Sequence, residues 1–511
     1  MEEQLPMTPS FTTSLRRLAL AGLTLLLAAC ATPQTDLTPS VRNELPKPWA
    51  ASPATAAEAP AAPLAATPTL QASDLLEDAL QPGQKVDLAA PDAQADLWSR
   101  VRGGFAMPDL DDAWVQKAEG WYGARPDYVE RMMSRGQRYL FHIVEEVQRR
   151  GLPTELALLP FIESAFVTTA QSRVKATGMW QFMPATGRDF ALKQNIFRDD
   201  RRDVLESTRA ALDYLERLYK QFGDWHLALA AYNWGQGNVA KAVARNEKLK
   251  RPTDYASLKL PDETRYYVPK LQAIKNIVLD AGRLGLALPS VANHPYFLSV
   301  KLERDIDVEL AAQFAGLSVE EFSLFNPQSN KPVILAAASP RVLLPYDQAG
   351  IFARNLAEHQ GPLASWTAWV VPKTMSTADA AKRFGLAEAR LRELNQIPPK
   401  MLVRAGSTLL VPRDAKDADD VAEAIAESAR LNLTPDQPPL RKLALKAGKA
   451  DTVASVAARY KASPQQVASW NKVGVNARFK PGQTVVVYTA PPAKASKPVQ
   501  LAVANKPARG R

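Results

Sequence analysis

The chain has 511 residues, of which 40 are proline and one is cysteine, and its formal net charge is +10. This length exceeds what one hydrophobic core usually organises, so several domains on linkers are expected. A single thiol excludes an internal disulfide. The basic balance favours an acidic polymer as partner, but no nucleic-acid-binding motif is recognisable, so nucleic acid is not an expected partner.

The first 29 residues have the pattern of an export signal. Two arginines precede a twelve-residue apolar run, 18–29, which is too short to span a bilayer but suits the core of a signal peptide. The run ends Leu-Ala-Ala-Cys30, which looks like a bacterial lipobox, so we expect residues 1–29 to be removed and Cys30 to carry a lipid. The alternative is an ordinary signal peptide with a chance cysteine. The residue after the cysteine is Ala31 and not an aspartate. In such lipoproteins this suggests that the protein is anchored on the periplasmic face of the outer membrane of a Gram-negative bacterium.

Three segments have little potential to form a core. Residues 30–95 are rich in alanine and proline and show no sustained period, so we expect a disordered tether. A coil of about 60 residues spans roughly 40–50 Å, enough to carry a domain from a membrane into a surrounding polymer. Residues 414–439 read as a charged connector, and residues 490–511 as a disordered basic tail.

The pattern from 96 to 290 is helical, with the central part at about 139–282. Apolar residues recur at three- and four-residue spacing over 204–222, and Gly223 can end this helix. A second helix is expected over 225–232, after an N-capping aspartate and before a turn with two glycines, Gly235 and Gly237. The sequence therefore predicts an all-α lobe with a groove.

One glutamate in this lobe, Glu163, stands among apolar residues. Prolines upstream place it at or near a helix end. Burial among apolar groups disfavours the carboxylate and raises its pKa, as an acid that donates a proton at neutral pH requires. The ordinary alternative is a helix-capping or ion-paired surface glutamate. The motif Glu163-Ser164, followed by Gly178-Met-Trp-Gln and later by Tyr232-Asn233, favours the catalytic reading.

Glycosidases usually need two carboxylates, the second as nucleophile or as base for water. No second acid of this lobe has an equally apolar setting. Four candidates lie in charged stretches and are expected to be solvated: Glu145, Glu146, Asp199 and Asp200. One acid suits a reaction in which no water attacks.

These motifs resemble those of the lytic transglycosylases with a goose-lysozyme-like catalytic domain. The resemblance implies an all-α lysozyme-like fold and cleavage of the β-1,4 bond between N-acetylmuramic acid and N-acetylglucosamine in peptidoglycan. Glu163 would protonate the glycosidic oxygen and then act as base for the C6 hydroxyl, which attacks C1 and leaves a 1,6-anhydro ring. No cofactor is implied, and the four histidines have no ligand spacing, so no metal is expected.

The resemblance also implies substrate-binding positions, namely Ser172, Gln181, Met183, Tyr232, Asn233 and Glu263. The Tyr232 hydroxyl would lie near the catalytic carboxyl, and Glu263 belongs to a segment similar to the closing Glu-Thr-x-x-Tyr-Val motif of the family. Each position also has an ordinary reading. Met183 and Tyr232 could be core residues, Ser172 a turn residue and Glu263 a charge at a helix start.

Three small repeats follow, and each reads as strand, helix, helix, strand. They align on an asparagine and cover 295–348 with Asn326, 365–413 with Asn395, and 441–489 with Asn471. They resemble LysM modules, which bind N-acetylglucosamine units of glycans. The third, with its Asp451-Thr452 pair, is the most similar. The first is degenerate, and the alternative is that it only braces the catalytic domain.

The leading hypothesis is therefore a membrane-anchored lytic transglycosylase held on the cell wall by LysM modules. Two alternatives stay open: a hydrolytic muramidase on the same fold, and a glycan-binding scaffold without activity.

Overall fold

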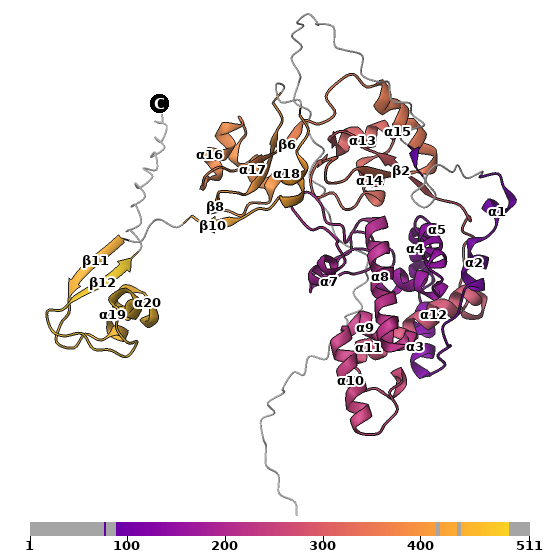
Figure 1. The fold of residues 1–511 in the computed structure, drawn as a ribbon, viewed down its shortest axis with the longest axis horizontal. Coiled ribbons are helices and arrows are strands. Elements are labelled where there is room, and N and C mark those ends of the chain that lie inside the picture. Colours follow the sequence, from indigo (N-terminus) through magenta and orange to yellow (C-terminus); the bar gives the residue numbers. More distant parts are fainter. Residues whose placement is uncertain (1–75, 78–87, 415–418, 437–440, 490–511) are drawn as a thin grey trace, which may run out of the picture. The chain divides into compact units, whose positions relative to one another are not determined.

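The computed structural model describes residues 76–77, 88–414, 419–436 and 441–489 (Figure 1). The expectations for the signal peptide 1–29, for a lipid on Cys30 and for the tail 490–511 lie outside the described residues. Within the described ranges, no helix is both long and apolar enough to cross a bilayer.

Two short elements lie in the segment 30–95, where no regular structure was expected. The strand β1 (Leu76–Glu77) pairs antiparallel with β2 (Phe297–Lys301), and the helix α1 (Pro91–Gln94) buries Ala93. The two-residue strand is too short to show a period, so only its backbone pairing with a distant strand reveals it. The tether expectation is wrong at these positions.

The helical lobe has the all-α architecture that the sequence predicts. Helix α12 packs on α3 and α9, and α9 packs on α8 and α10 (Figure 1). Three 3₁₀ turns lie among the helices, at Thr154–Leu158, Tyr255–Ser257 and Gly282–Leu284. The helices are α2 (Leu97–Gly103), α3 (Ala113–Gly123), α4 (Pro126–Gly136), α5 (Leu140–Arg149), α6 (Leu159–Glu163), α7 (Pro184–Asp189), α8 (Val204–Phe222), α9 (Trp225–Trp234), α10 (Gln236–Lys248), α11 (Asp262–Arg265) and α12 (Tyr267–Leu279).

The predicted helix ends hold for α8 and differ at the end of α9. Helix α8 has the predicted bounds and stops at Gly223, whose φ of 66° is the left-handed conformation that glycine favours. The Asp224 carboxylate caps α9 as expected. Helix α9 continues to Trp234 and ends at Gly235, with a φ of 94°. Gly237 does not close α9, because it already lies within α10.

An aromatic cluster supports the end of α6. The rings of Phe161 and Phe166 meet edge to face, with their centroids 4.6 Å apart, and the ring of Tyr139 stacks on Phe166 at 6.3 Å. All three side chains are at most 2% exposed. Burying each such ring contributes about 1.5–3 kcal/mol, so the backbone that carries Glu163 rests on a rigid part of the core.

Each of the three repeats is a βααβ unit, as predicted, with its first and last strands paired antiparallel. The first consists of β2, α13 (Val308–Phe314), α14 (Val319–Phe325) and β5 (Arg341–Pro345). The second consists of β6 (Trp366–Val370), α16 (Thr377–Arg383), α17 (Glu388–Asn395) and β9 (Thr408–Pro412). The third consists of β11 (Arg441–Lys446), α19 (Val453–Tyr460), α20 (Pro464–Asn471) and β12 (Thr484–Thr489).

The asparagine that marks each repeat joins its second helix to its last strand. The side-chain amide of Asn326, Asn395 and Asn471 donates to the carbonyl four residues earlier and to a strand carbonyl, while its oxygen accepts from the backbone N–H of the same strand residue. The strand partners are Leu343, Leu410 and Val486, with distances of 2.7–2.9 Å. Because both the nitrogen and the oxygen of the side-chain amide are used, the three repeats share an asparagine at this position.

The repeats also contain elements that the sequence reading did not predict. A long helix, α15 (Tyr346–Glu358), follows the first unit. Short strands form small sheets of their own, one from β3 (Ile306–Asp307) and β4 (Val333–Ile334), and another that pairs β7 (Met375–Ser376) with β8 (Met401–Val403).

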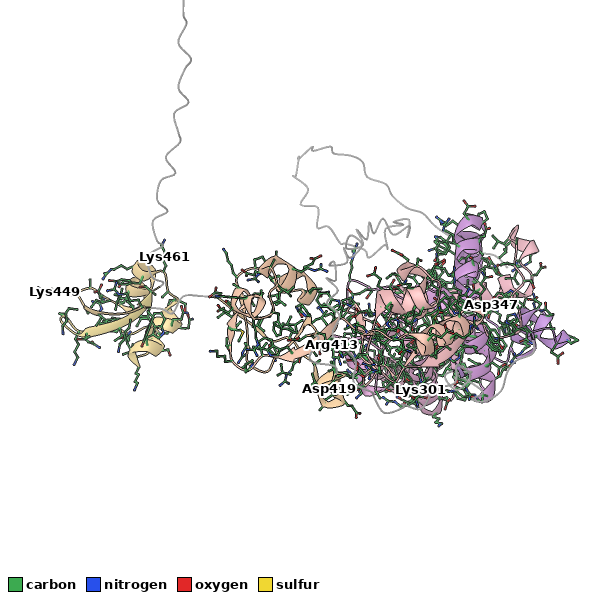
Figure 2. The ribbon with its side chains drawn as sticks, turned by 90° about the horizontal axis from the view of Figure 1, so that it is seen from above. Lys301, Asp347, Arg413, Asp419, Lys449 and Lys461 are labelled. Atoms are coloured by element: carbon green, nitrogen blue, oxygen red, sulfur yellow. The ribbon has the colours of Figure 1, made fainter. Side chains whose placement is uncertain are left out.

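The interpretation of 414–439 as a connector without core potential is wrong for its described part. It forms α18 (Glu423–Ser428) and a strand, β10 (Leu433–Pro435), that pairs with β8. Val421 and Ala426 are buried. The Arg413 guanidinium donates to the carbonyl of Asp419 at 3.0 Å, and both residues are labelled in Figure 2. It also donates to the buried Asp305 carboxylate at 2.8 Å. Small apolar residues and one buried ion pair thus fix a segment whose composition reads as linker.

Candidate active site

Glu163 is the last residue of α6, at the helix end where the sequence placed it. Ala165 and Phe166, two and three residues after Glu163, have φ values of 49° and 59°. Two consecutive residues in the left-handed region turn the chain sharply, a conformation that residues with a Cβ adopt rarely. The side chain of Glu163 is partly buried, so its carboxyl group is removed from most of the solvent without being sealed off.

The Gly178-Met-Trp-Gln motif lies directly beside this helix end. The Ser164 hydroxyl donates to the carbonyl of Met179 at 2.9 Å. Gly178 has a φ of 87°, and a Cβ on it would lie 1.9 Å from the carbonyl oxygen of Arg201. Only glycine fits such a close backbone approach. The two motifs that the sequence singled out are therefore in contact.

The Tyr232 hydroxyl, which the resemblance places near the carboxyl group of Glu163, donates a hydrogen bond to the carbonyl of Trp180 at 2.9 Å. Burial raises the pKa of Tyr232, and the charge of Glu163 raises it further, so the two groups are near enough to interact. Tyr232 thus fixes the motif next to Glu163.

The direct partner of Glu163 is Tyr267, a residue that the sequence reading did not single out. Its hydroxyl donates a hydrogen bond to Oε1 of Glu163. Tyr267 is 2% exposed, and burial raises its pKa well above the usual value, so the hydroxyl keeps its proton and stays a donor. A signal was available, because Tyr267 occupies the tyrosine of the Glu-Thr-x-x-Tyr-Val segment.

Burial raises the pKa of Glu163 to about 7. The hydrogen bond from Tyr267 and the charge of Lys270 oppose this shift, whereas the charge of Glu263 adds to it. A carboxyl group with this pKa is protonated in an appreciable fraction of molecules at neutral pH. It can therefore donate a proton and, once ionised, take one back.

Lys270, one helical turn after Tyr267 on α12, was also missed. Its Nζ lies 5.9 Å from the ring centroid of Tyr267 and 5.8 Å from that of Tyr266. Burial lowers the pKa of Lys270, while the charges of Glu163 and Glu263 act in the opposite direction. Because no sequence motif marks this lysine, only its position in the fold reveals it.

Gln181 and Ser172 are engaged in local turns next to the site. The Gln181 amide donates to the carbonyl of Gly178 at 2.8 Å, and its own φ is 50°. The Ser172 hydroxyl accepts from the backbone N–H of Ala176 at 3.0 Å. The Ser172 hydroxyl therefore also holds a turn.

The three other expected residues lie at the surface or between helices. Met183 is 42% exposed, which does not agree with a core role. Asn233 accepts a hydrogen bond from the Thr264 hydroxyl at 2.8 Å and so ties α9 to α11. Glu263 is exposed in the first turn of α11.

Other acids of the lobe are buried, contrary to expectation, namely Glu119, Glu155 and Asp200. Of these, Asp200 serves the neighbouring loop. Asp200 is 5% exposed, and burial raises its pKa to about 7. Its carboxylate accepts from the backbone N–H of Lys193 at 3.0 Å and pairs with Arg198 at 3.4 Å. The carboxylate whose charge acts on Glu163 is that of Glu263. Within the described ranges, no cluster of three His, Cys, Asp or Glu could hold a metal ion.

Comparison with known proteins identifies the family of this chain. The chain matches the model of the transglycosylase SLT domain over 142–254, that of the LysM-like domain of lytic transglycosylase MltD over 296–361, and that of the LysM domain over 381–412 and 448–487. Membrane-bound lytic murein transglycosylase D of Escherichia coli K12 is 30% identical over 413 residues, which are 78% of this chain and 86% of that protein. The chain belongs to the membrane-bound lytic murein transglycosylase D family.

The same figures hold for the transglycosylase D of Escherichia coli O6:H1. A solved structure, an inactive mutant of lytic transglycosylase Slt from Pseudomonas aeruginosa, is 26% identical and covers 29% of this chain and 24% of that chain, with a TM-score of 0.21. A TM-score this low says nothing about the fold. Membership of the transglycosylase D family confirms the resemblance inferred from the Glu163 motif and from the LysM-like repeats.

Proposed function

We propose that this member of the transglycosylase D family cleaves the β-1,4 bond between N-acetylmuramic acid and N-acetylglucosamine in peptidoglycan and leaves 1,6-anhydromuramic acid ends. One observation carries the proposal. Glu163 has a pKa of about 7 and accepts a hydrogen bond from Tyr267 at one oxygen. The carboxylate whose charge acts on Glu163 is that of Glu263, which is exposed.

The geometry supports a two-step use of one acid. Tyr267 occupies Oε1, and in the described part of the chain no hydrogen bond involves Oε2 of Glu163, which is therefore the oxygen that can carry the mobile proton. In the first step this proton passes to the glycosidic oxygen as the C1–O bond breaks. In the second step the C6 hydroxyl bonds to C1, and its proton returns to Glu163. No water is consumed. Because the nucleophile belongs to the reacting sugar itself, proximity lowers the activation barrier by roughly several kcal/mol.

The residues around Glu163 then divide into two roles. Tyr267, Tyr232 and Asn233 position the catalytic carboxyl and its supporting turns. We propose Gln181, Met183, Ser172 and Glu263 as contacts for the glycan, on the grounds of family resemblance and, for Met183 and Glu263, of their exposure.

The anchoring and the modules are further parts of the proposal. Cys30 would hold the protein by a lipid on the periplasmic face of the outer membrane, and residues 30–95 would span the distance to the cell wall. The units 295–348, 365–413 and 441–489 would bind N-acetylglucosamine units. The match of the last two to the LysM model supports this role for them.

Digestion of purified sacculi tests the reaction. A lytic transglycosylase leaves muropeptides lighter by one water than a hydrolase does, which mass spectrometry resolves. We expect anhydro ends from the wild-type chain, none from Glu163→Gln, and unchanged release from Glu247→Gln, which alters an exposed glutamate on α10. Reducing ends would identify a muramidase, and no release from the wild-type chain would identify a glycan-binding scaffold.

A further inference from the structure

A partly buried cation stands next to the catalytic carboxyl without a protein partner. In the part of the chain that the structure describes, the ammonium of Lys270 has neither a hydrogen bond nor an ion pair, although two aromatic rings flank it within 6 Å, about the range of a cation–π contact. Burial lowers its pKa, which shows that it is partly desolvated.

Lys270 is partly exposed, so its ammonium keeps contact with solvent and can reach a ligand. An ammonium that has lost part of its water gains from an anionic partner, because aromatic rings alone do not replace that water. The charged and titratable groups that face Lys270 are Glu163 and Glu263, with Tyr266 and Tyr267 beside them. Neither carboxylate lies within the 4.0 Å of an ion pair. The ammonium is therefore free to bind an acceptor on a bound ligand.

The glycan offers one group that matches this cation. Both sugars of peptidoglycan carry an N-acetyl group, but only N-acetylmuramic acid carries a lactyl ether on its ring. Its carboxyl group is an amide in strands that bear peptides and a free carboxylate in strands stripped of peptides. A carboxylate forms charge-assisted hydrogen bonds with an ammonium, and these are about twice as strong as neutral ones.

We propose that Lys270 is a specificity-determining residue that binds the lactyl group of the N-acetylmuramic acid at Glu163, with a preference for the free carboxylate of stripped strands. The inference rests on the proposed function, since it places this sugar at the catalytic acid. It adds a consequence for the acid itself. A carboxylate bound at Lys270 cancels the positive charge that lowers the pKa of Glu163, so the substrate helps Glu163 to keep its proton.

The test compares two substrates that differ in one charge. Stripped glycan strands with free lactyl carboxylates are compared with the same strands after amidation of these carboxylates. We expect the wild-type chain to have a KM for the free strands that is lower by roughly tenfold or more. Lys270→Met should remove this preference, Lys270→Arg should restore most of it, and Lys241→Met, an exposed lysine on α10, should leave it intact.

Several outcomes would overturn the proposal. An equal rise of KM for both strands in Lys270→Met would indicate an N-acetyl contact or a structural role. An unchanged KM with a shifted pH profile would show that Lys270 acts on Glu163 through charge alone. Thermal melting of each variant identifies loss of folding, and Lys270→Gln replaces Lys270→Met if the latter unfolds. Reducing ends from the wild-type chain would refute the proposed reaction but leave the KM comparison valid.

Discussion

The hydroxyl of Tyr267, the first residue of α12, donates a hydrogen bond to Oε1 of Glu163, the last residue of α6. The contact joins residues 104 apart in the sequence. It orients the carboxyl group and engages only Oε1. It also lowers the pKa of Glu163 against the larger effect of burial. The acidity of the site is thus a balance between desolvation and one protein donor.

The first prediction concerns the pH dependence of the wild-type enzyme. In the proposed reaction Glu163 must carry a proton for the first step, and its pKa is about 7. The value of kcat/KM should therefore be high in the acidic range and fall about tenfold per pH unit well above pH 7. Initial rates of release from sacculi between pH 5 and 9 measure this. Constant activity up to pH 9 would contradict the role of Glu163 as the acid.

The second prediction concerns Tyr267→Phe. The change removes the donor to Oε1 and keeps the ring that packs in the core. Because the lost hydrogen bond lowers the pKa of Glu163, that pKa rises, and the alkaline fall in kcat/KM should move to higher pH. The value of kcat should drop roughly tenfold, since the carboxyl group loses its orientation.

Tyr255→Phe is the matched control for this change, because it too removes a hydroxyl that donates hydrogen bonds within the lobe, here to the backbone carbonyls of Thr264 and Arg265 and not to Glu163. The control should leave the pH profile in place. An identical shift in both variants would mean that a general loosening of the lobe is responsible.

How much of this site could be predicted from sequence depends on whether a residue acts within one segment or across two. Glu163, Gly178 and the helix bounds of α8 follow from local spacing and propensity, so they were found. Tyr267 and Lys270 act on Glu163 only because α12 packs beside α6. No local pattern marks Lys270, and the only sequence signal for Tyr267 is its place in the Glu-Thr-x-x-Tyr-Val segment.

The same difference between local and long-range contacts explains where the sequence predictions are wrong. Asp200 lies in a charged stretch and was expected in solvent, but tertiary packing buries it. The short strands β1 and β10 are defined by partners far along the chain, β2 and β8. Two or three residues carry no period of their own.

The third prediction couples activity to stability. The pKa of Glu163 is about 7 in the folded chain against 4.5 for the free side chain. Because the folded value is raised, the folded state is most favoured below pH 4.5 and loses stability as pH rises to 7. Glu163→Gln removes this loss, so it should be inactive yet more stable than the wild-type chain, by on the order of 1–3 kcal/mol at pH 8 and by little at pH 4.5. Thermal melting at both pH values measures the difference, and an equal gain at both would contradict it.

The fourth prediction concerns the turn beside the catalytic acid. Gly178→Ala places a Cβ 1.9 Å from the carbonyl oxygen of Arg201, at a φ of 87°. The backbone must move, so we expect a loss of stability of about 3 kcal/mol or more and little remaining activity. Gly120→Ala is the control, because nothing lies within 4 Å of its Cβ and it sits within α3. That change should stabilise the chain by up to about 1 kcal/mol.

The fifth prediction concerns the asparagine of the third module. Asn471→Ala removes two donors and one acceptor that join α20 to β12, at distances of 2.7–2.9 Å. The strand residue Val486 then loses the side-chain partners of both its N–H and its carbonyl, and we expect the module to lose about 2–3 kcal/mol. Hydrogen exchange over 441–489 in the full chain should speed up while exchange in the helical lobe stays the same. Asn471→Asp keeps the acceptor and loses the donors, so its exchange rate over 441–489 should lie between those of the wild-type chain and of Asn471→Ala. A module that exchanges as slowly in Asn471→Ala as in the wild-type chain would show that strand pairing alone holds the βααβ unit together.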